Sequence, residues 1–240
     1  MANNYFRFKQ FTVDQDRAAM KVCTDACLFG AYIAAAIADG KLTATNILDI
    51  GTGTGLLSLM LAQKTNAGID AVEIDNAAYY QAKGNFEHGP FREQLHVFHS
   101  DIAQFDATKK YDCIISNPPF FEKDLKSSDH TKNAAKHDTT LTLQQLLDSV
   151  IKHLTGEGFF AILLPYHRIN YFVEEAEKKG LYLSKKILVK QTPLHAWFRG
   201  ILIFTRHQTV PTKEEISIRD NMGDYTAKFI DLLQDYYLYL

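Results

Sequence analysis

The spacing between apolar residues changes repeatedly along the chain, and these changes predict a regular series of strands and helices. Short apolar runs bounded by glycine or polar residues are typical of buried strands, whereas apolar positions three or four residues apart are typical of helices. Runs of the first kind occur at residues 45–51, 68–75, 94–101, 111–117 and 156–165. Helical spacing occurs at residues 26–38, 56–63, 76–86, 141–154 and 166–179. From residue 45 onward the two kinds alternate, which predicts an α/β fold with a mostly parallel sheet between two layers of helices.

The last two apolar runs, at residues 181–191 and 196–206, have no helix between them. Two consecutive strands with a short connection form an antiparallel hairpin. We therefore expect a doubly wound sheet of seven strands that ends in an antiparallel hairpin at one edge. Local signals agree, since Asp75 is placed to cap the helix at 76–86 and the pair Gly156 and Gly158 is expected to form the turn that opens the fifth strand.

The length of 240 residues and an ordinary apolar content fit a single domain spanning residues 1–240. With a net charge of −2, the protein as a whole does not attract nucleic acids or membranes electrostatically. Any such partner must bind to local charged patches on the surface. Three cysteines without metal-ligand spacing predict neither disulfides nor a zinc site, and we expect no metal. The apolar stretch at 26–38 is shorter than the roughly 20 residues that a membrane span needs. With no signal sequence at the start, we expect a cytoplasmic protein, most simply a monomer.

The segment LDIGTGTG at residues 48–55 joins the first strand to a helix. Glycines at such a junction let the backbone approach a ligand closely. A dinucleotide loop has the spacing G-x-G-x-x-G and holds a pyrophosphate. Here Gly51, Gly53 and Gly55 are spaced more tightly, and Asp49 precedes them. A carboxylate suits an ammonium group better than a pyrophosphate, which favours S-adenosylmethionine as the cofactor.

Acidic residues also end the next two strands. Glu73 follows the glycine loop by about 20 residues, where α/β nucleotide sites place an acid that binds ribose hydroxyls. Asp101 ends the third strand and could accept a hydrogen bond from an adenine amino group. The simpler alternative is that the glycines form a tight turn and the acids cap helices. The ordered set Asp49, Glu73 and Asp101 favours a cofactor site, and residues 45–120 resemble the core of Rossmann-like class I S-adenosylmethionine-dependent methyltransferases.

The segment SNPPFF at residues 116–121 ends the fourth strand, beside the first. Two consecutive prolines stiffen the backbone, because each fixes φ and extends the residue before it. The Asn117 amide oxygen and the Pro118 carbonyl thereby form a rigid pair of acceptors for a planar NH₂ group. Phe120 is expected to stack on the acceptor ring. The alternative is a proline-rich loop with two core aromatic residues.

This motif resembles the [ND]-P-P-[FYW] signature of methyltransferases that act on planar nitrogens. The resemblance implies that Asn117, Pro118 and Phe120 form the acceptor site, and that Asn117 also contacts the cofactor. Acceptors in that group include adenine N6, guanine N2 and the glutamine side-chain amide. A guanine-N2 ribosomal RNA methyltransferase and a release-factor glutamine methyltransferase therefore stand as alternatives.

The N-terminal segment narrows the choice of acceptor. FRFKQF at residues 6–11 and MKVCTDACLFGA at residues 20–31 resemble the opening of the bacterial family that methylates adenine N6 beside the anticodon of valine tRNA. The chain departs from that pattern at Cys23 and Ala26, where the family has glycine. The C-terminal segment from residue 224 resembles the family's ending as well. The resemblance implies that Lys21, Thr24 and Asp25 line the cofactor pocket.

Basic and aromatic residues alternate near the N-terminus, a combination that suits single-stranded RNA. The basic residues are Arg7, Lys9, Arg17 and Lys21, and the aromatic ones are Phe6, Phe8 and Phe11. We therefore expect residues 1–40 to contact RNA and cofactor, and the resemblance implies a valine tRNA as the partner. A second basic group follows the SNPPFF motif and comprises Lys123, Lys126, Lys132 and Lys136. Solvated surface charge is the alternative explanation for each of these lysines.

Overall fold

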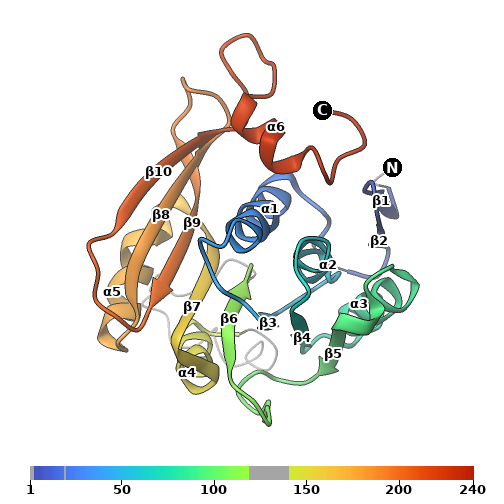
Figure 1. Ribbon diagram of the computed structural model, residues 1–240, viewed down its shortest axis with the longest axis vertical. Helices are drawn as coiled ribbons and strands as arrows, with labels where there is room; N and C mark the ends of the chain where they lie inside the picture. The colour runs from blue at the N-terminus through green and yellow to red at the C-terminus, as the bar shows by residue number, and fades with distance from the viewer. Residues whose placement is uncertain (1–2, 19, 119–140) are drawn as a thin grey trace, which may run out of the picture.

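The computed structural model describes residues 3–18, 20–118 and 141–240, which form a central sheet between two helical layers (Figure 1). The sheet contains eight strands. In spatial order they are β10 (Thr212–Ser217), β8 (Tyr182–Lys190), β9 (Trp197–Thr205), β7 (Leu154–Pro165), β6 (Tyr111–Ser116), β3 (Asn46–Ile50), β4 (Gly68–Glu73) and β5 (Leu95–His99). The five strands from β7 to β5 run parallel, as predicted.

Helices cover both faces of this sheet. They are α1 (Thr24–Ala38), α2 (Leu56–Ala62), α3 (Asn76–His88), α4 (Leu143–His153), α5 (Ile169–Lys178) and α6 (Ala227–Leu233). Buried side chains of α1, α2, α3 and α6 form one hydrophobic cluster with one face of the sheet, and those of α4 and α5 form a second cluster with the other face. The doubly wound α/β prediction is confirmed.

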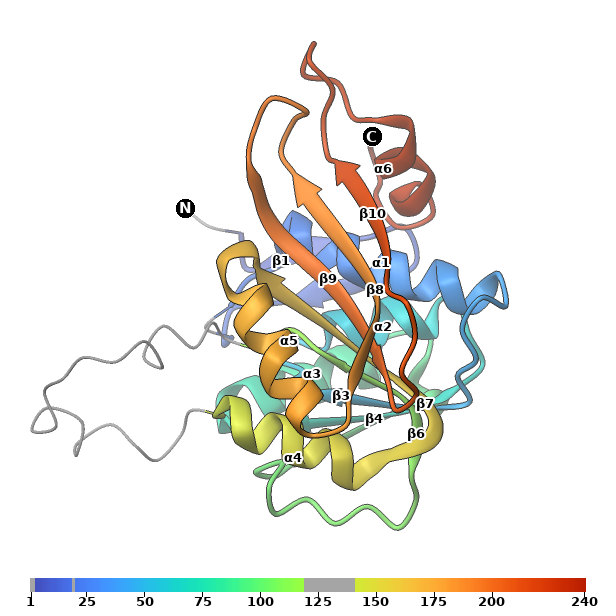
Figure 2. The same cartoon turned by 90° about the vertical axis from the view of Figure 1, so that its left-hand side faces the viewer.

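The antiparallel hairpin of β8 and β9 is present, but it does not form the edge of the sheet. A further strand, β10, pairs in parallel with β8 and raises the number of strands to eight instead of the predicted seven. Figure 2 shows β8, β9 and β10 side by side, with α5 beside β8. The sequence of β10, TKEEIS, is polar except for Ile216, and only Ile216 is buried, so its strand conformation depends on pairing with β8.

Two predicted boundaries also differ. Strand β7 starts at Leu154 and runs through Gly156 and Gly158, which do not form a turn that opens it. Its register with β6 shifts between Tyr111 and Cys113, so the glycines lie in an irregular stretch of the ladder. The helix predicted at 166–179 is a 3₁₀ turn, Tyr166–Arg168, followed by α5.

Two helix caps, of which the sequence predicts the one at Asp75, explain where α3 and α4 begin. The Asp75 carboxylate accepts a hydrogen bond of 2.8 Å from the Ala78 backbone N–H, as expected for an N-cap. At the start of α4, Thr142 and Gln145 form a reciprocal capping box. Both caps lie close to the cavity described below, so they also fix part of its wall.

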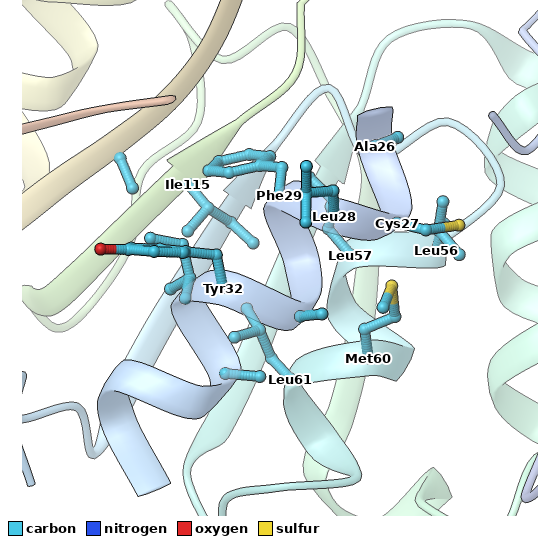
Figure 3. Packing of buried hydrophobic residues seen from close by; sticks show 14 of the residues in the cluster. Ala26, Cys27, Leu28, Phe29, Tyr32, Leu56, Leu57, Met60, Leu61 and Ile115 are labelled. Atoms are coloured by element: carbon cyan, nitrogen blue, oxygen red, sulfur yellow. The ribbon is translucent and has the colours of Figure 1, made fainter. Parts of the chain in front are cut away.

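The contact between α1 and α2 forms a large part of the first hydrophobic cluster. Figure 3 shows Leu28 and Phe29 of α1, with Leu57 and Leu61 of α2, in the packed region beside the sheet. Gly30 permits this close packing, because a Cβ atom there would lie 2.8 Å from the Met60 sulfur. In the described part of the chain, no helix is long and apolar enough to cross a membrane.

The N-terminal aromatic residues belong to the core, which corrects the expectation that they face RNA. They lie within a small antiparallel hairpin of β1 (Tyr5–Arg7) and β2 (Thr12–Asp14): Phe6 is part of β1, and Phe8 and Phe11 lie in the connection between the two strands. Phe8 and Phe11 are only 2% and 5% exposed, and their rings stack with centroids 4.6 Å apart. Phe6 is partly buried against the same cluster. Burial of apolar rings is more favourable than their exposure to water, so the Phe8 and Phe11 rings stabilise the fold and are not available to stack on bases.

Candidate active site

A cavity of about 570 Å³ opens where the parallel strands end. Its lining comes from the loops after β3, β4, β5 and β6, from the start of α4 and from the N-terminal segment. The loop and strand-end residues are 50–54, 72–75, 100–102 and 117–118. Ligands of open α/β sheets bind at this carboxyl edge. The cavity is thus located where the sequence motifs predicted a ligand site.

The glycine loop after β3 adopts a backbone that only glycine tolerates well. Gly51, Gly53 and Gly55 have φ values of 72°, 59° and 82°. A Cβ atom at Gly55 would also lie 2.4 Å from the Phe86 ring of α3. At Gly51 and Gly53 a Cβ atom would meet no atom within 4 Å, which matches their place on the cavity wall. The loop therefore presents bare backbone to a ligand.

Glu73, at the end of β4, fixes this loop to the neighbouring strand. Its Oε2 atom accepts a hydrogen bond of 2.8 Å from the Gly53 N–H, and its Oε1 atom accepts one of 2.9 Å from the Asp75 N–H. A carboxylate has about four acceptor positions, so Glu73 can still accept further hydrogen bonds. Asp101, after β5, also lines the cavity, and its Oδ1 atom accepts a hydrogen bond of 2.9 Å from the Ala103 N–H.

Asp49, in β3 directly before the loop, is fully buried and is not among the residues that line the cavity. Its Oδ2 atom accepts hydrogen bonds from the hydroxyls of Thr52 at 2.6 Å and Ser58 at 2.7 Å, while Oδ1 has no partner. Burial raises the pKa of Asp49 to about 6, against the opposing effect of these two hydrogen bonds. An unpartnered buried carboxylate oxygen has a remaining capacity to accept a hydrogen bond from a ligand cation.

Asn117 and Pro118 follow β6 and line the cavity together with the glycine loop. The Asn117 Nδ2 atom lies 3.9 Å from the sulfur of Met20, and its Oδ1 atom is buried without a hydrogen-bond partner. This oxygen therefore has unused capacity to accept a hydrogen bond. Phe120 lies outside the described residues, as do Lys123, Lys126, Lys132 and Lys136, so their assignments remain predictions.

Of the three N-terminal residues with predicted cofactor roles, the structure places only one in the wall of the cavity. Lys21 lines the cavity, whereas Thr24 and Asp25, the first residues of α1, do not. Thr24 lies near the Tyr237 side chain, and the Asp25 carboxylate pairs with Arg199 at 2.7 Å. The assignment of Thr24 and Asp25 to the cofactor remains a prediction based on resemblance.

The two departures from the family pattern fit the local geometry. Cys23, at the N-cap of α1, has φ −133° and ψ 155°, an extended conformation that does not require glycine. Ala26 lines the cavity, so its methyl group occupies space that a glycine would leave open.

Sequence reasoning missed several residues of the cavity wall. Met20 lies in the wall beside Asn117, and Thr142 and Gln145 contribute from the start of α4. The capping box of Thr142 and Gln145 is visible in the sequence, but it marks a helix start and not a ligand contact. In the part of the chain that the structure describes, no cluster of three or more His, Cys, Asp or Glu side chains could hold a metal ion.

Comparison with known proteins identifies the family. The family model of the methyltransferase small domain matches residues 31–165. Curated relatives named tRNA1(Val) (adenine(37)-N6)-methyltransferase include those of Dyadobacter fermentans, with 43% identity over 98% of both chains, and Cytophaga hutchinsonii, with 41% identity over 100% of both chains. The relative from Proteus mirabilis is 38% identical over 98% of this chain and 94% of its own.

Solved structures of methyltransferases share the fold at much lower identity. A predicted O-methyltransferase from Agrobacterium tumefaciens has a TM-score of 0.64 at 15% identity, covering 88% of this chain and 96% of that chain. The glycopeptide N-methyltransferase MtfA, solved with S-adenosylmethionine, has a TM-score of 0.54 at 12% identity, covering 73% and 93%. These likenesses establish the class I methyltransferase fold. Because the curated relatives match over nearly the whole length, the chain belongs to the tRNA1(Val) (adenine(37)-N6)-methyltransferase family.

Proposed function

We propose that this enzyme transfers the methyl group of S-adenosylmethionine to N6 of adenine 37 in a valine tRNA. One observation carries the proposal for the site: the Asn117–Pro118 pair opens on the same cavity as the glycine loop and Glu73. The names of the relatives, which match over nearly the whole chain, support the choice of acceptor.

The chemistry of the cavity fits S-adenosylmethionine, the cofactor of this methyltransferase class. Its volume of about 570 Å³ suits a nucleoside-sized ligand. Gly51 and Gly53 allow close backbone approach, and Glu73 can accept hydrogen bonds from ribose hydroxyls in addition to its two backbone donors. We assign Asp101 to the adenine amino group and Asp49, with its unpartnered Oδ1 atom, to the ammonium group. When bound, the cofactor supplies an electrophilic methyl group on a sulfonium centre.

Asn117 and Pro118 are assigned to the acceptor amine. The Asn117 Oδ1 atom and the Pro118 carbonyl can each accept one N–H of an exocyclic NH₂ group. An exocyclic amine is a poor nucleophile because its lone pair is delocalised into the ring. Holding both N–H groups favours a pyramidal nitrogen and stabilises the positive charge that develops on it during transfer. This arrangement requires no strong general base.

The position of Asn117 and Pro118 in the cavity wall requires the acceptor base to enter the cavity. A base that enters a closed pocket must first leave its stack, and an anticodon loop offers bases that are already partly unstacked. We assign a stacking role on that base to Phe120. Within the single domain that we propose for residues 1–240, the N-terminal segment contacts the cofactor through residues 18 and 20–22, which line the cavity. A cytoplasmic, monomeric enzyme is the simplest form of this proposal.

The experiment is methyl transfer from labelled S-adenosylmethionine to total tRNA and, in a separate reaction, to ribosomal RNA, each followed by nucleoside analysis. The proposal predicts label in N6-methyladenosine. Label in N2-methylguanosine of ribosomal RNA, with none in tRNA, would support the guanine-N2 alternative instead. Transfer to a release-factor glutamine, tested in a parallel reaction, would support the third candidate.

A further inference from the structure

The segment between β2 and α1 forms one wall of the cavity and is held there by buried side-chain amides. We call it the N-terminal strap and define it by residues 14–18 and 20–22. Four of its residues line the cavity: Ala18, Met20, Lys21 and Val22. The strap begins at Asp14, the last residue of β2, and the Gln15 N–H donates a hydrogen bond of 2.7 Å to the Asn4 carbonyl. The question is which side chains hold the strap against α3 and the glycine loop.

Asn85 of α3 makes the central connection. Its side chain is 3% exposed and uses its amide fully. The Nδ2 atom donates to the carbonyl oxygens of Asp14 at 2.9 Å and Thr54 at 2.8 Å, and the Oδ1 atom accepts from the Asp14 N–H at 2.9 Å. An amide has two donors and one acceptor group, and all of them are used here. One side chain therefore joins the strap to the glycine loop.

Two glutamines hold the rest of the strap. Gln81 lies one helical turn before Asn85 on the same face of α3, and its Oε1 atom accepts a hydrogen bond of 2.9 Å from the Arg17 N–H. Gln15 lies within the strap, and its Oε1 atom accepts one of 2.8 Å from the Val22 N–H. Both glutamines are buried. Three backbone N–H groups of the strap thus depend on buried side chains.

The strap in turn touches the acceptor site. The Met20 sulfur lies 3.9 Å from the Asn117 Nδ2 atom, and both residues line the cavity. We propose that Asn85 is a positioning residue, which holds the N-terminal strap and the glycine loop in register and so preforms both the cofactor wall and the Met20 contact of Asn117. Its effect on methyl transfer rests on the proposed function, whereas its effect on the strap does not.

The variant Asn85→Asp isolates this role because it keeps the shape of the side chain. A carboxylate can still accept from the Asp14 N–H, but it cannot donate to the carbonyls of Asp14 and Thr54. Two buried carbonyl oxygens then face a carboxylate oxygen, which is unfavourable. If the aspartate variant does not fold, Asn85→Ser, which retains one hydroxyl donor, takes its place.

The matched control is Tyr111→Phe. The Tyr111 hydroxyl donates a buried hydrogen bond of 2.7 Å to Asp70 at the amino ends of β6 and β4, the opposite edge of the sheet. Removing it deletes a buried hydrogen bond without touching the strap. The control therefore reports what general destabilisation alone does to the strap.

The experiment measures amide hydrogen exchange of a peptide covering residues 12–22 in ligand-free protein, and S-adenosylhomocysteine binding by calorimetry. For Asn85→Asp we expect exchange in the strap to rise about tenfold or more and cofactor affinity to fall by a similar factor, while Tyr111→Phe changes neither beyond about twofold. Unchanged exchange in Asn85→Asp, or an equal rise in the Tyr111→Phe control, overturns the inference. If wild-type protein binds no S-adenosylhomocysteine, the proposed function fails, and the exchange measurement still tests the strap.

Discussion

Glu73 holds Gly53 across the carboxyl edge of the sheet: its Oε2 atom accepts a hydrogen bond of 2.8 Å from the Gly53 backbone N–H. Gly53 has a φ of 59°, so the bond stabilises a backbone conformation that the loop needs to leave its ligand-facing side open. One carboxylate thus shapes the glycine loop and remains able to bind the ligand.

We expect Glu73→Ala to weaken S-adenosylhomocysteine binding by roughly 10- to 100-fold, because charge-assisted hydrogen bonds contribute about 1.5–3 kcal/mol each. Calorimetry measures the affinity. Thr226→Ala is the control for lost stability alone, since Thr226 caps α6 away from the cavity. An unchanged affinity in Glu73→Ala would remove this residue from the cofactor site.

Asn117→Ala is expected to lower turnover by about 10²–10³ and leave S-adenosylhomocysteine affinity within about threefold, since the amide oxygen is assigned to the acceptor amine. Asn117→Asp keeps an acceptor oxygen and should retain more activity than the alanine variant. Single-turnover kinetics with saturating cofactor measure the effect. Near-full activity of Asn117→Ala would refute the role assigned to this amide.

Asp49 predicts a pH dependence of stability in the ligand-free protein. Burial raises its pKa from 3.8 to about 6, so between these values the folded chain holds a proton that the unfolded chain has released. The contribution of Asp49 to stability therefore falls as pH rises through this window. The free energy of unfolding of Asp49→Asn, taken relative to wild type, should rise by on the order of 2 kcal/mol between pH 4 and pH 7. Each pKa unit corresponds to about 1.4 kcal/mol.

Urea unfolding of both proteins across that pH range provides the measurement. The same variant should bind S-adenosylhomocysteine more weakly at pH 7, because a neutral amide attracts an ammonium group less than a carboxylate does. A difference in unfolding free energy that stays constant with pH would contradict the assignment of a raised pKa to Asp49.

Phe8→Ala is expected to destabilise the fold by about 3–5 kcal/mol, since its ring lies in the core. Tyr5→Ala, in the same hairpin but 56% exposed, should change the free energy of unfolding by less than about 0.5 kcal/mol. Denaturant unfolding distinguishes the two variants. If Phe8→Ala unfolds like wild type and loses only tRNA affinity, the core assignment of this ring is wrong.

The sequence predicts the sheet and its strand-end motifs well, because both follow from short-range patterns. Buried parallel strands are nearly continuous apolar runs, and acids at their carboxyl ends must converge on one edge, as Glu73 and Asp101 do in the cavity wall. The sequence does not predict β10, because Lys213, Glu214 and Glu215 interrupt any regular spacing of apolar residues. Pairing with β8 determines the conformation of this strand.

Other features depend on contacts between distant segments, and no local pattern reports them. The Phe8 and Phe11 rings resemble an RNA-binding pattern in the sequence, but they are buried in the core, where Phe8 packs beside Tyr237 of the C-terminal segment and Phe11 beside Phe91. The resemblance assigns Asp25 to the cofactor pocket, and no local pattern reports its pairing with Arg199, 174 positions away in the chain. Asn85 is one polar residue in a helix, and only the folded chain places Asp14 and Thr54 beside it.

The central claim is methylation of N6 on adenine 37 of valine tRNA, and it is tested most directly with two valine tRNA transcripts that differ only at that base. Wild-type enzyme and labelled S-adenosylmethionine are incubated with the natural transcript and with one that carries guanine at position 37. The account predicts about one methyl group per natural transcript, recovered as N6-methyladenosine, and at least roughly 100-fold slower transfer to the guanine transcript, because Asn117 and Pro118 are left without the adenine amine. Transfer at an equal rate to both transcripts would contradict it.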